Sequence, residues 1–216
     1  MMAHPANVIA VVGAESTGKT SLVHELTRVL SGRGVDVVMV PEVLREFCDA
    51  HGRTPAVHEQ QGIAREQTQR ILDASRSHDW VVADTTALMT AVYSEYIFRD
   101  HSLYDQAMLD HSASALTLLT SLDIAWTPDS FIRDGAHVRE PVDTLIRQTL
   151  IRHGVSFQVV AGTGAARVNH ALSAVEHVIG GGAGASAALR GKSQWRWYCD
   201  NCDDGECEQH WLSRLK

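Results

Sequence analysis

The segment NVIAVVGAESTGKTSLVHELTRVL, residues 7–30, predicts a strand, a glycine-bearing loop and a helix in direct succession. Residues 8–12 form a short apolar run rich in β-branched side chains, which is typical of a buried strand. Residues 21–30 repeat leucine and valine at helical spacing. Between them, residues 13–20 match the pattern GxxxxGK(S/T) of a phosphate-binding loop (P-loop), in the structural context that this pattern requires.

The residues of this loop have the chemistry to bind a nucleoside triphosphate. Glycines at both ends allow the backbone to curl so that successive N–H groups point inward, and the following helix adds the positive end of its dipole. Lys19 supplies a charge for the β- and γ-phosphates, and Thr20 supplies a hydroxyl for Mg²⁺. We therefore expect ATP and Mg²⁺ as cofactors. The expected nucleotide-binding residues are Gly13, Glu15, Ser16, Thr17, Gly18, Lys19, Thr20 and Ser21.

The composition is that of a soluble enzyme. Hydrophobic residues make up 44% of the 216 residues, and the formal net charge of −7 argues against a nucleic-acid footprint over the whole surface. No stretch approaches the roughly 20 apolar residues of a membrane span. The first residues lack the charged and apolar regions of a secretory signal. We therefore expect a cytoplasmic protein whose four cysteines are thiols or metal ligands rather than disulfides.

Short apolar runs alternate with longer amphipathic ones, which predicts an α/β fold with a mainly parallel, five-stranded sheet flanked by helices. The expected strands are 8–12, 35–40, 80–84, 116–122 and 157–160, and the expected helices are 21–30, 59–75, 86–98, 105–114, 142–152 and 165–178. We predict a P-loop domain over residues 1–179, a linker rich in glycine and alanine over residues 180–194, and a small tail over residues 195–216.

The tail carries two short pairs of metal-ligating residues. Cys199 and Cys202 form the first pair, and Cys207 and His210 form the second. Three thiolates and one imidazole make a tetrahedral ligand set, so we predict a structural zinc site, with metal-free cysteines as the alternative. The acidic residues of the tail argue against nucleic acid, and we favour a protein partner. Cys48 lies apart from this cluster and is expected to be a packed thiol.

Two acidic residues follow predicted strands. Asp84 ends the run 80–84 and is predicted to help hold Mg²⁺, with a helix cap as the alternative role. Glu42 follows the second strand, which we expect beside the first strand, at the carboxyl edge where ligands collect. Its carboxylate can accept the proton of an attacking hydroxyl or hold a substrate hydroxyl. Arg45, one helical turn later, can neutralise Glu42 or reach a phosphate, and a solvated ion pair is the alternative.

The polar stretch between residues 123 and 141 follows a late strand and carries Arg133 and Arg139. A small-molecule kinase must exclude water during transfer, so we predict an arginine-bearing lid in this stretch. A long surface loop is the alternative. Trp126 can stack on a base or act as a packing anchor.

These motifs resemble the ribosylnicotinamide kinase domain of NadR-type proteins, within the AAA-like P-loop family. Residues 13–20 are similar to the family's GxESxGKS/T, residues 41–46 to EYxRE, residues 84–86 to DTD, and the stretch from Trp126 through Asp129 to WxxDGxR. The resemblance covers roughly residues 7–179 and implies phosphorylation of nicotinamide riboside with MgATP. The predicted catalytic residues are Lys19, Glu42, Asp84, Arg133 and Arg139, and the predicted acceptor-binding residues are Glu42, Arg45, Trp126 and Asp129.

Three positions depart from the family pattern. Thr86 stands where the second aspartate would be, and Ser130 replaces the lid glycine, with the following arginine displaced to Arg133. A second interpretation therefore stays open: an ATP-dependent switch or adaptor that hydrolyses ATP slowly and presents the zinc-binding tail to a protein partner. ADP formation that depends on the riboside favours the kinase, and turnover without the riboside favours the adaptor.

Overall fold

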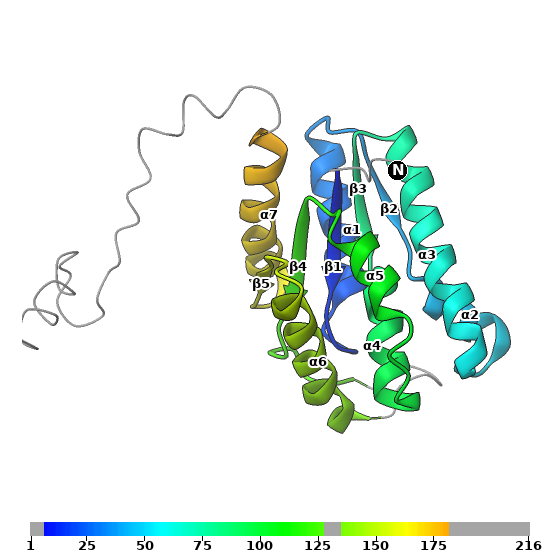
Figure 1. Cartoon of the computed structure of the whole chain (residues 1–216). Coiled ribbons are helices and arrows are strands. Elements are labelled where there is room, and N and C mark those ends of the chain that lie inside the picture. The colour runs from blue at the N-terminus through cyan, green and yellow to red at the C-terminus, as the bar shows by residue number, and fades with distance from the viewer. Residues whose placement is uncertain (1–6, 128–134, 182–216) are drawn as a thin grey trace, which may run out of the picture. The chain divides into compact units, whose positions relative to one another are not determined.

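Figure 1 shows the computed structural model of the chain, which describes residues 7–127 and 135–181. Its strands are β1 (Val8–Val12), β2 (Val37–Val40), β3 (Trp80–Asp84), β4 (Leu116–Thr120) and β5 (Gln158–Val160). They form one sheet in the order β2-β3-β1-β4-β5, and each neighbouring pair is parallel. The expected α/β class is confirmed, and the sheet is parallel throughout the described residues.

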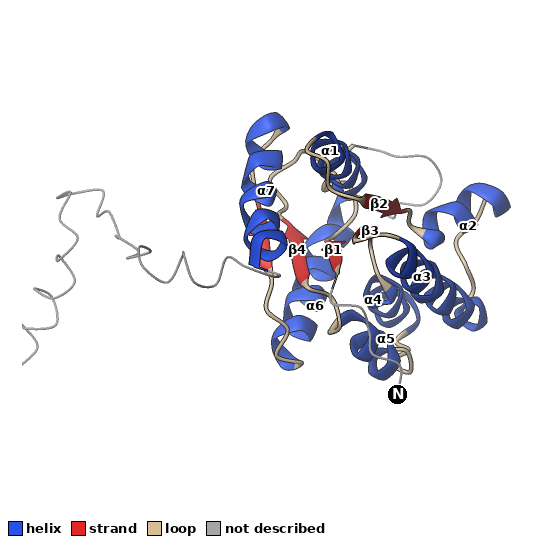
Figure 2. Ribbon diagram, turned by 90° about the horizontal axis from the view of Figure 1, so that it is seen from above, coloured by secondary structure: helices blue, strands red, loops and turns tan. Residues whose placement is uncertain are grey.

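Helices cover both faces of this sheet, as the view from above in Figure 2 shows. One face carries α1 (Lys19–Gly32) and α7 (Gly164–Gly181). The other face carries α3 (Val57–Ser77), α4 (Ala87–Phe98), α5 (Tyr104–His111) and α6 (Arg139–Arg152). A short 3₁₀ turn, Ala136–Val138, directly precedes α6. The helix α2 (Val43–His51) follows the edge strand β2. No helix within the described ranges is long and apolar enough to cross a membrane.

The predicted position of the second strand was wrong. We expected it beside β1, but β3 lies between the two strands, because β3 pairs with β1 on one side and with β2 on the other. Burial explains the order. In β3 all residues except Trp80 are buried, whereas in β2 only Val40 is buried, so β3 fills an interior position and β2 an edge position. Asp84, rather than Glu42, therefore follows the direct neighbour of the P-loop strand.

A helical turn was expected from Glu42 to Arg45, but α2 was not among the predicted helices. Its nine residues bury only Val43 and Cys48, so its apolar pattern extends over barely two turns. The helix ends at His51, and the next residue, Gly52, has a φ of 64°, in the left-handed region that glycine adopts at low cost. At the other end of the chain, α7 continues to Gly181, two residues into the predicted linker.

The core fixes the position of the P-loop. All five residues of β1 are buried, and α1, which the loop leads into, packs on the sheet with the buried side chains Leu22, Val23, Leu26 and Leu30. Residues up to Val178 form one compact unit, and a second unit begins at Ile179. The predicted linker and tail, with the four zinc ligands, lie outside the described residues apart from residues 180 and 181, so the predicted domain limits stay predictions.

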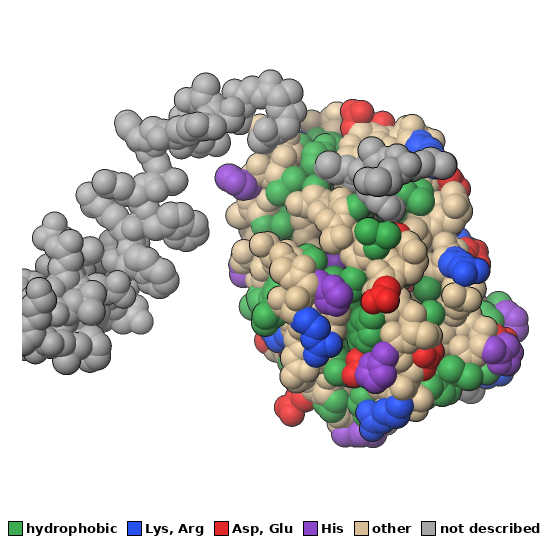
Figure 3. All heavy atoms as spheres, viewed as in Figure 1, with side chains coloured by type: hydrophobic (Ala, Val, Ile, Leu, Met, Phe, Trp, Pro, Cys, Tyr) green, Lys and Arg blue, Asp and Glu red, His purple; other side chains and the backbone are tan. Residues whose placement is uncertain are grey.

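Figure 3 shows one face of the described residues, where acidic and basic side chains are interspersed and no continuous basic area forms.

Candidate active site

The P-loop connects β1 to α1 in a conformation that its glycines permit. Gly13 has a φ of 152° and Gly18 a φ of 74°, and Ser16 between them has a φ of 55°. A Cβ atom on Gly13 would lie 2.0 Å from Oγ1 of Thr120 at the end of β4. Only glycine therefore fits at position 13 while Thr120 is in place.

Hydrogen bonds within the loop and to β4 hold this conformation. Oγ1 of Thr17 donates to the carbonyl oxygen of Ala14 at 2.7 Å and lies 2.7 Å from Oγ1 of Thr120. Nζ of Lys19 donates to the same carbonyl oxygen at 3.0 Å. These bonds fix the loop backbone, and a backbone that is already fixed lowers the entropy cost of binding a phosphate group.

The remaining predicted residues of the loop differ in exposure. Glu15 is only 7% exposed, and Ser16 is half-buried. Ser21 is exposed in the first turn of α1.

The two residues predicted to hold Mg²⁺ are in direct contact. Oγ1 of Thr20 donates to Oδ2 of Asp84 at 2.6 Å, across the register pair Val11–Asp84 of β1 and β3. Asp84 is 2% exposed, and its other oxygen, Oδ1, is buried without a hydrogen-bond partner in the described part of the chain. An unpartnered buried carboxylate oxygen is costly, and hydroxyl and carboxylate oxygens are ligands that Mg²⁺ accepts. The residues present therefore fit a magnesium ion.

The alternative role for Asp84, a helix cap, belongs to Thr86. Thr86 is the N-cap of α4, and its Oγ1 accepts from the N–H of Leu88 at 3.4 Å. The same Oγ1 lies 2.9 Å from Nδ1 of His111, whose Nε2 lies 3.0 Å from Oγ1 of Thr117. Burial lowers the pKa of His111 to about 4, so its ring is neutral at pH 7. Where the family resemblance leads one to expect a second acid, this chain has a hydroxyl that joins α4 to α5.

Glu42 follows the carboxyl end of β2. The P-loop follows the carboxyl end of β1, so both lie on the same side of the parallel sheet. Glu42 is half-buried and is the N-cap residue of α2, but its side chain makes no capping hydrogen bond. Arg45, in the first turn of the same helix, is also half-buried. Cys48 is 1% exposed, and burial raises the pKa of its thiol to about 11, as expected for a packed cysteine.

The predicted lid begins with a contact to the P-loop. Oγ of Ser16 donates to the carbonyl oxygen of Thr127 at 3.1 Å and accepts from the N–H of Thr127 at 3.0 Å. Trp126, one residue earlier, is half-buried. Asp129 and Arg133 lie outside the described residues.

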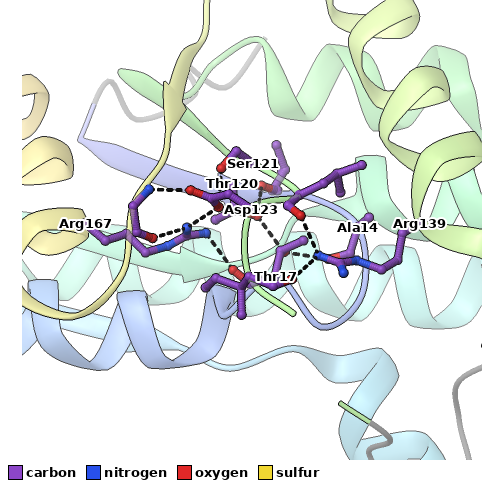
Figure 4. A network of polar contacts seen from close by, with 11 residues as sticks. Ala14, Thr17, Thr120, Ser121, Asp123, Arg139 and Arg167 are labelled. Atoms are coloured by element: carbon purple, nitrogen blue, oxygen red, sulfur yellow. Dashed lines mark hydrogen bonds and ion pairs between the residues drawn. The ribbon is translucent and has the colours of Figure 1, made fainter. Parts of the chain in front are cut away.

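Arg139 is the first residue of α6 and is 8% exposed. Its Nη2 donates to the carbonyl oxygens of Leu122 at 3.3 Å and Ile124 at 2.8 Å, as Figure 4 shows. In this structure Arg139 therefore anchors the segment that follows β4, and its predicted action on a phosphoryl group stays a prediction.

A second buried arginine, Arg167 of α7, contacts the P-loop backbone (Figure 4). Its Nη2 donates to the carbonyl oxygen of Thr17 at 2.6 Å, and its Nη1 donates to Oδ1 of Asp123 at 3.1 Å and to the carbonyl oxygen of Gly162 at 2.9 Å. Burial raises the pKa of Asp123, but hydrogen bonds from Ser121, from the N–H of Gly162 and from Arg167 outweigh this and hold the pKa at about 2. The carboxyl group of Asp123 is therefore ionised at pH 7.

The P-loop, the buried acid that follows the neighbouring strand and the parallel sheet agree with a family model described as an AAA domain, which matches residues 8–167. The chain belongs to this family. Two crystal structures of the NadR protein have a similar fold, one in complex with NAD and AMP-PNP (TM-score 0.63) and one in complex with NR (TM-score 0.64). Each is 20% identical in sequence and covers 81% of this chain.

This AAA-domain chain spans about half the length of the NadR protein, 50% and 51% in the two structures. A comparison with curated proteins found no match. At 20% identity the likeness to NadR shows a common P-loop fold.

Sequence reasoning missed Arg167 as part of the site of this AAA-domain protein. One signal was present: the arginine falls in the first turn of a predicted helix, where the helix dipole disfavours a cation. A cation in that position requires a specific partner, and Asp123 with the carbonyl oxygen of Thr17 provides it.

Proposed function

We propose that this protein is a P-loop kinase that transfers the γ-phosphoryl group of MgATP to a small nucleoside-like acceptor, with nicotinamide riboside as the first candidate. One observation carries the proposal: Asp84 is the last residue of β3 and Glu42 lies two residues beyond the end of β2, so both carboxylates lie at the carboxyl end of the sheet, from which the P-loop emerges. The fold supports it, since NadR was crystallised with AMP-PNP and NAD and with NR.

In this mechanism the P-loop N–H groups and Lys19 bind the phosphates. Thr20 and Asp84 would hold Mg²⁺, which when bound neutralises charge on the triphosphate. Glu42 accepts the proton of the acceptor hydroxyl. At the same time the oxygen of that hydroxyl forms a bond to the γ-phosphorus. The bond from that phosphorus to the bridging oxygen breaks, and ADP leaves. Catalysis thus depends mainly on positioning and charge neutralisation.

The remaining predicted residues keep supporting roles in the proposal. Arg45, Trp126 and Asp129 are assigned to the acceptor. Arg133 and Arg139 are assigned to the transferring group, and Arg139 would have to exchange the carbonyl oxygens of Leu122 and Ile124 for a phosphoryl oxygen to reach it.

The test measures ADP formation from MgATP with and without nicotinamide riboside, and then with other nucleosides. Glu42→Gln keeps the shape of the side chain but cannot accept the proton, and loss of a general base costs about 100- to 10,000-fold in rate. We expect this loss with MgATP affinity preserved in calorimetry. The control is Asp49→Asn, which removes an exposed carboxylate from the same helix. Near-normal transfer by Glu42→Gln would reduce Glu42 to a structural residue.

A second candidate function is the ATP-dependent switch or adaptor. The engagement of Thr86 with His111 favours it, because no second acid follows Asp84. ADP formation at the same rate with and without every nucleoside, abolished by Lys19→Ala, would support the adaptor and contradict the kinase.

A further inference from the structure

A glutamine of α3 holds the backbone on both sides of Glu42. Oε1 of Gln67 accepts from the N–H of Val43 at 2.8 Å, and Nε2 of Gln67 donates to the carbonyl oxygen of Pro41 at 3.3 Å. Gln67 is 2% exposed, so these contacts lie in the protein interior, away from competing water. A single side chain thus fixes the residue before and the residue after the predicted acceptor carboxylate.

Gln67 also pairs one of the unpartnered N–H groups at the start of α2. The first N–H groups of a helix have no partner within the helix, and the side chain of the N-cap residue commonly accepts from one of them. Glu42 is the N-cap of α2 and makes no such bond, while Gln67 satisfies the N–H of Val43 from another helix. The first N–H of α2 is therefore paired from α3, and Glu42 makes no side-chain capping bond at this helix start.

A primary amide can make both contacts at once, because its oxygen accepts while its NH₂ group donates. An ionised glutamate at position 67 would accept from Val43 but would repel the carbonyl oxygen of Pro41. A leucine would make neither contact and would leave the buried N–H of Val43 without a partner. Pro41 adds a fixed φ immediately before Glu42, so the direction in which the Glu42 side chain leaves the backbone is constrained from both sides.

We propose that Gln67 is a positioning residue that holds Glu42 in the orientation needed to take the proton of the acceptor hydroxyl. This rests on the kinase function proposed above. Gln67 touches neither substrate in this scheme and acts through Glu42. A misplacement of the order of 1 Å at a reacting group costs about 100-fold in rate, which sets the scale of its expected effect.

The test compares Gln67→Leu with a matched control, Gln60→Leu. Gln60 lies two turns earlier on α3 and is also 2% exposed, but it donates to the carbonyl oxygen of Pro55 at 3.4 Å and contacts neither neighbour of Glu42. All rates are measured well below the melting temperatures of both variants. We expect Gln67→Leu to lower kcat for nucleoside phosphorylation about 10- to 100-fold, with the Kd for MgATP within twofold of wild type. Gln60→Leu should keep kcat within about threefold. Gln67→Glu, which keeps one of the two contacts, should fall between wild type and Gln67→Leu.

A double-mutant cycle separates positioning from general stability. If Gln67 acts through Glu42, adding Gln67→Leu to Glu42→Gln should cost less than about threefold more, because the group that it positions has already lost its function. Multiplicative losses would overturn the inference, as would equal losses in Gln67→Leu and Gln60→Leu. A wild type that transfers phosphate to no nucleoside would overturn the proposed function and this inference together, whereas an active wild type with multiplicative losses would overturn the inference alone.

Discussion

Asp84 uses its two oxygens differently, and the difference has a measurable consequence. Oδ2 accepts from Thr20, while Oδ1 is buried without a partner in the described ranges. Asp84→Asn keeps an oxygen for Thr20 but removes the negative charge. The magnesium concentration that gives half-maximal turnover should therefore rise by about tenfold or more, since roughly 1.4 kcal/mol of lost attraction is a factor of ten.

A magnesium titration of ATP turnover measures this effect. The control is Asp79→Asn, which removes an exposed carboxylate just before β3. An unchanged magnesium requirement in Asp84→Asn would show that Asp84 binds Thr20 and nothing else.

At the scale of residues, the sequence predicted those site residues that belong to a local sequence pattern. The P-loop and the strand that ends in Asp84 each consist of consecutive residues with a recognisable pattern. Both Thr20 and Asp84 were predicted to hold Mg²⁺ on this basis, and the structure places them in contact. Gln67 and Arg167 were missed because their partners are backbone atoms 24 and 150 residues away. Such pairs depend on how helices pack on the sheet, which no local spacing encodes.

Among the elements, α7 is joined to the P-loop by Arg167. Arg167→Leu leaves the carbonyl oxygen of Thr17 and the carboxylate of Asp123 without this donor. We expect a loss of about 1–3 kcal/mol in the free energy of unfolding. Because the loop is less well fixed, the Kd for MgATP should rise about tenfold, a loss of roughly 1.4 kcal/mol. Urea unfolding and calorimetry measure the two effects.

The chain offers a matched control for this variant. Arg33, at the end of α1, forms an ion pair with Glu176 of α7. Both side chains of this pair are about half exposed. An exposed pair contributes about 0–1 kcal/mol, so Arg33→Leu should change stability little and should not change MgATP affinity. Equal effects of Arg33→Leu and Arg167→Leu on that affinity would contradict a specific link between Arg167 and the loop.

His111 links α4, α5 and β4, and its burial makes this link sensitive to pH. The pKa of His111 is lowered to about 4 by burial, whereas an exposed histidine titrates near 6.5. The unfolded chain therefore binds the additional proton first. The contribution of neutral His111 to stability is complete above about pH 6.5 and is lost as the pH falls toward 4, by about 3 kcal/mol in order of magnitude.

Urea unfolding at several pH values tests this link. The difference in stability between wild type and His111→Gln should shrink between pH 7 and pH 4, because the glutamine does not titrate. A difference that stays constant with pH would exclude the titration of His111 as its cause.

The elements themselves were largely predictable, and their ends were less so. β1 and β3 have the predicted limits, because a polar residue or a glycine bounds each apolar run. β4 is two residues shorter than predicted, since Leu122 continues the apolar run beyond the last residue that pairs with β1. Of α2 only the turn from Glu42 to Arg45 was predicted, because only two residues of this helix are buried.

For the whole molecule, the sequence predicts a tail that is separable from the P-loop domain. Removal of residues 191–216 should leave the Kd for MgATP within a factor of two, because every predicted nucleotide-binding residue precedes residue 140. Metal analysis of the full chain, purified without chelator, should give about one zinc per chain, as one closed set of four ligands holds one ion. Cys199→Ser combined with Cys202→Ser should remove it. A zinc-free full chain, or a large loss of MgATP affinity on truncation, would contradict this organisation.

The class of the fold was predictable from the alternation of short and long apolar patterns, whereas the order of the strands was not. The alternation requires only that each strand returns through a helix to a parallel neighbour. Which neighbour it meets depends on the relative burial of β2 and β3, and these two strands differ in sequence by little.

The contact between Gly13 and Thr120 links two positions that are far apart in the chain. A Cβ atom at residue 13 would lie 2.0 Å from the hydroxyl oxygen of Thr120 and 3.2 Å from its carbonyl oxygen. In evolutionary terms, a substitution at one of the two positions depends on the residue at the other. A lineage that replaces Gly13 must first have a smaller residue at position 120 and a small shift of β4, so the two positions should covary across the family.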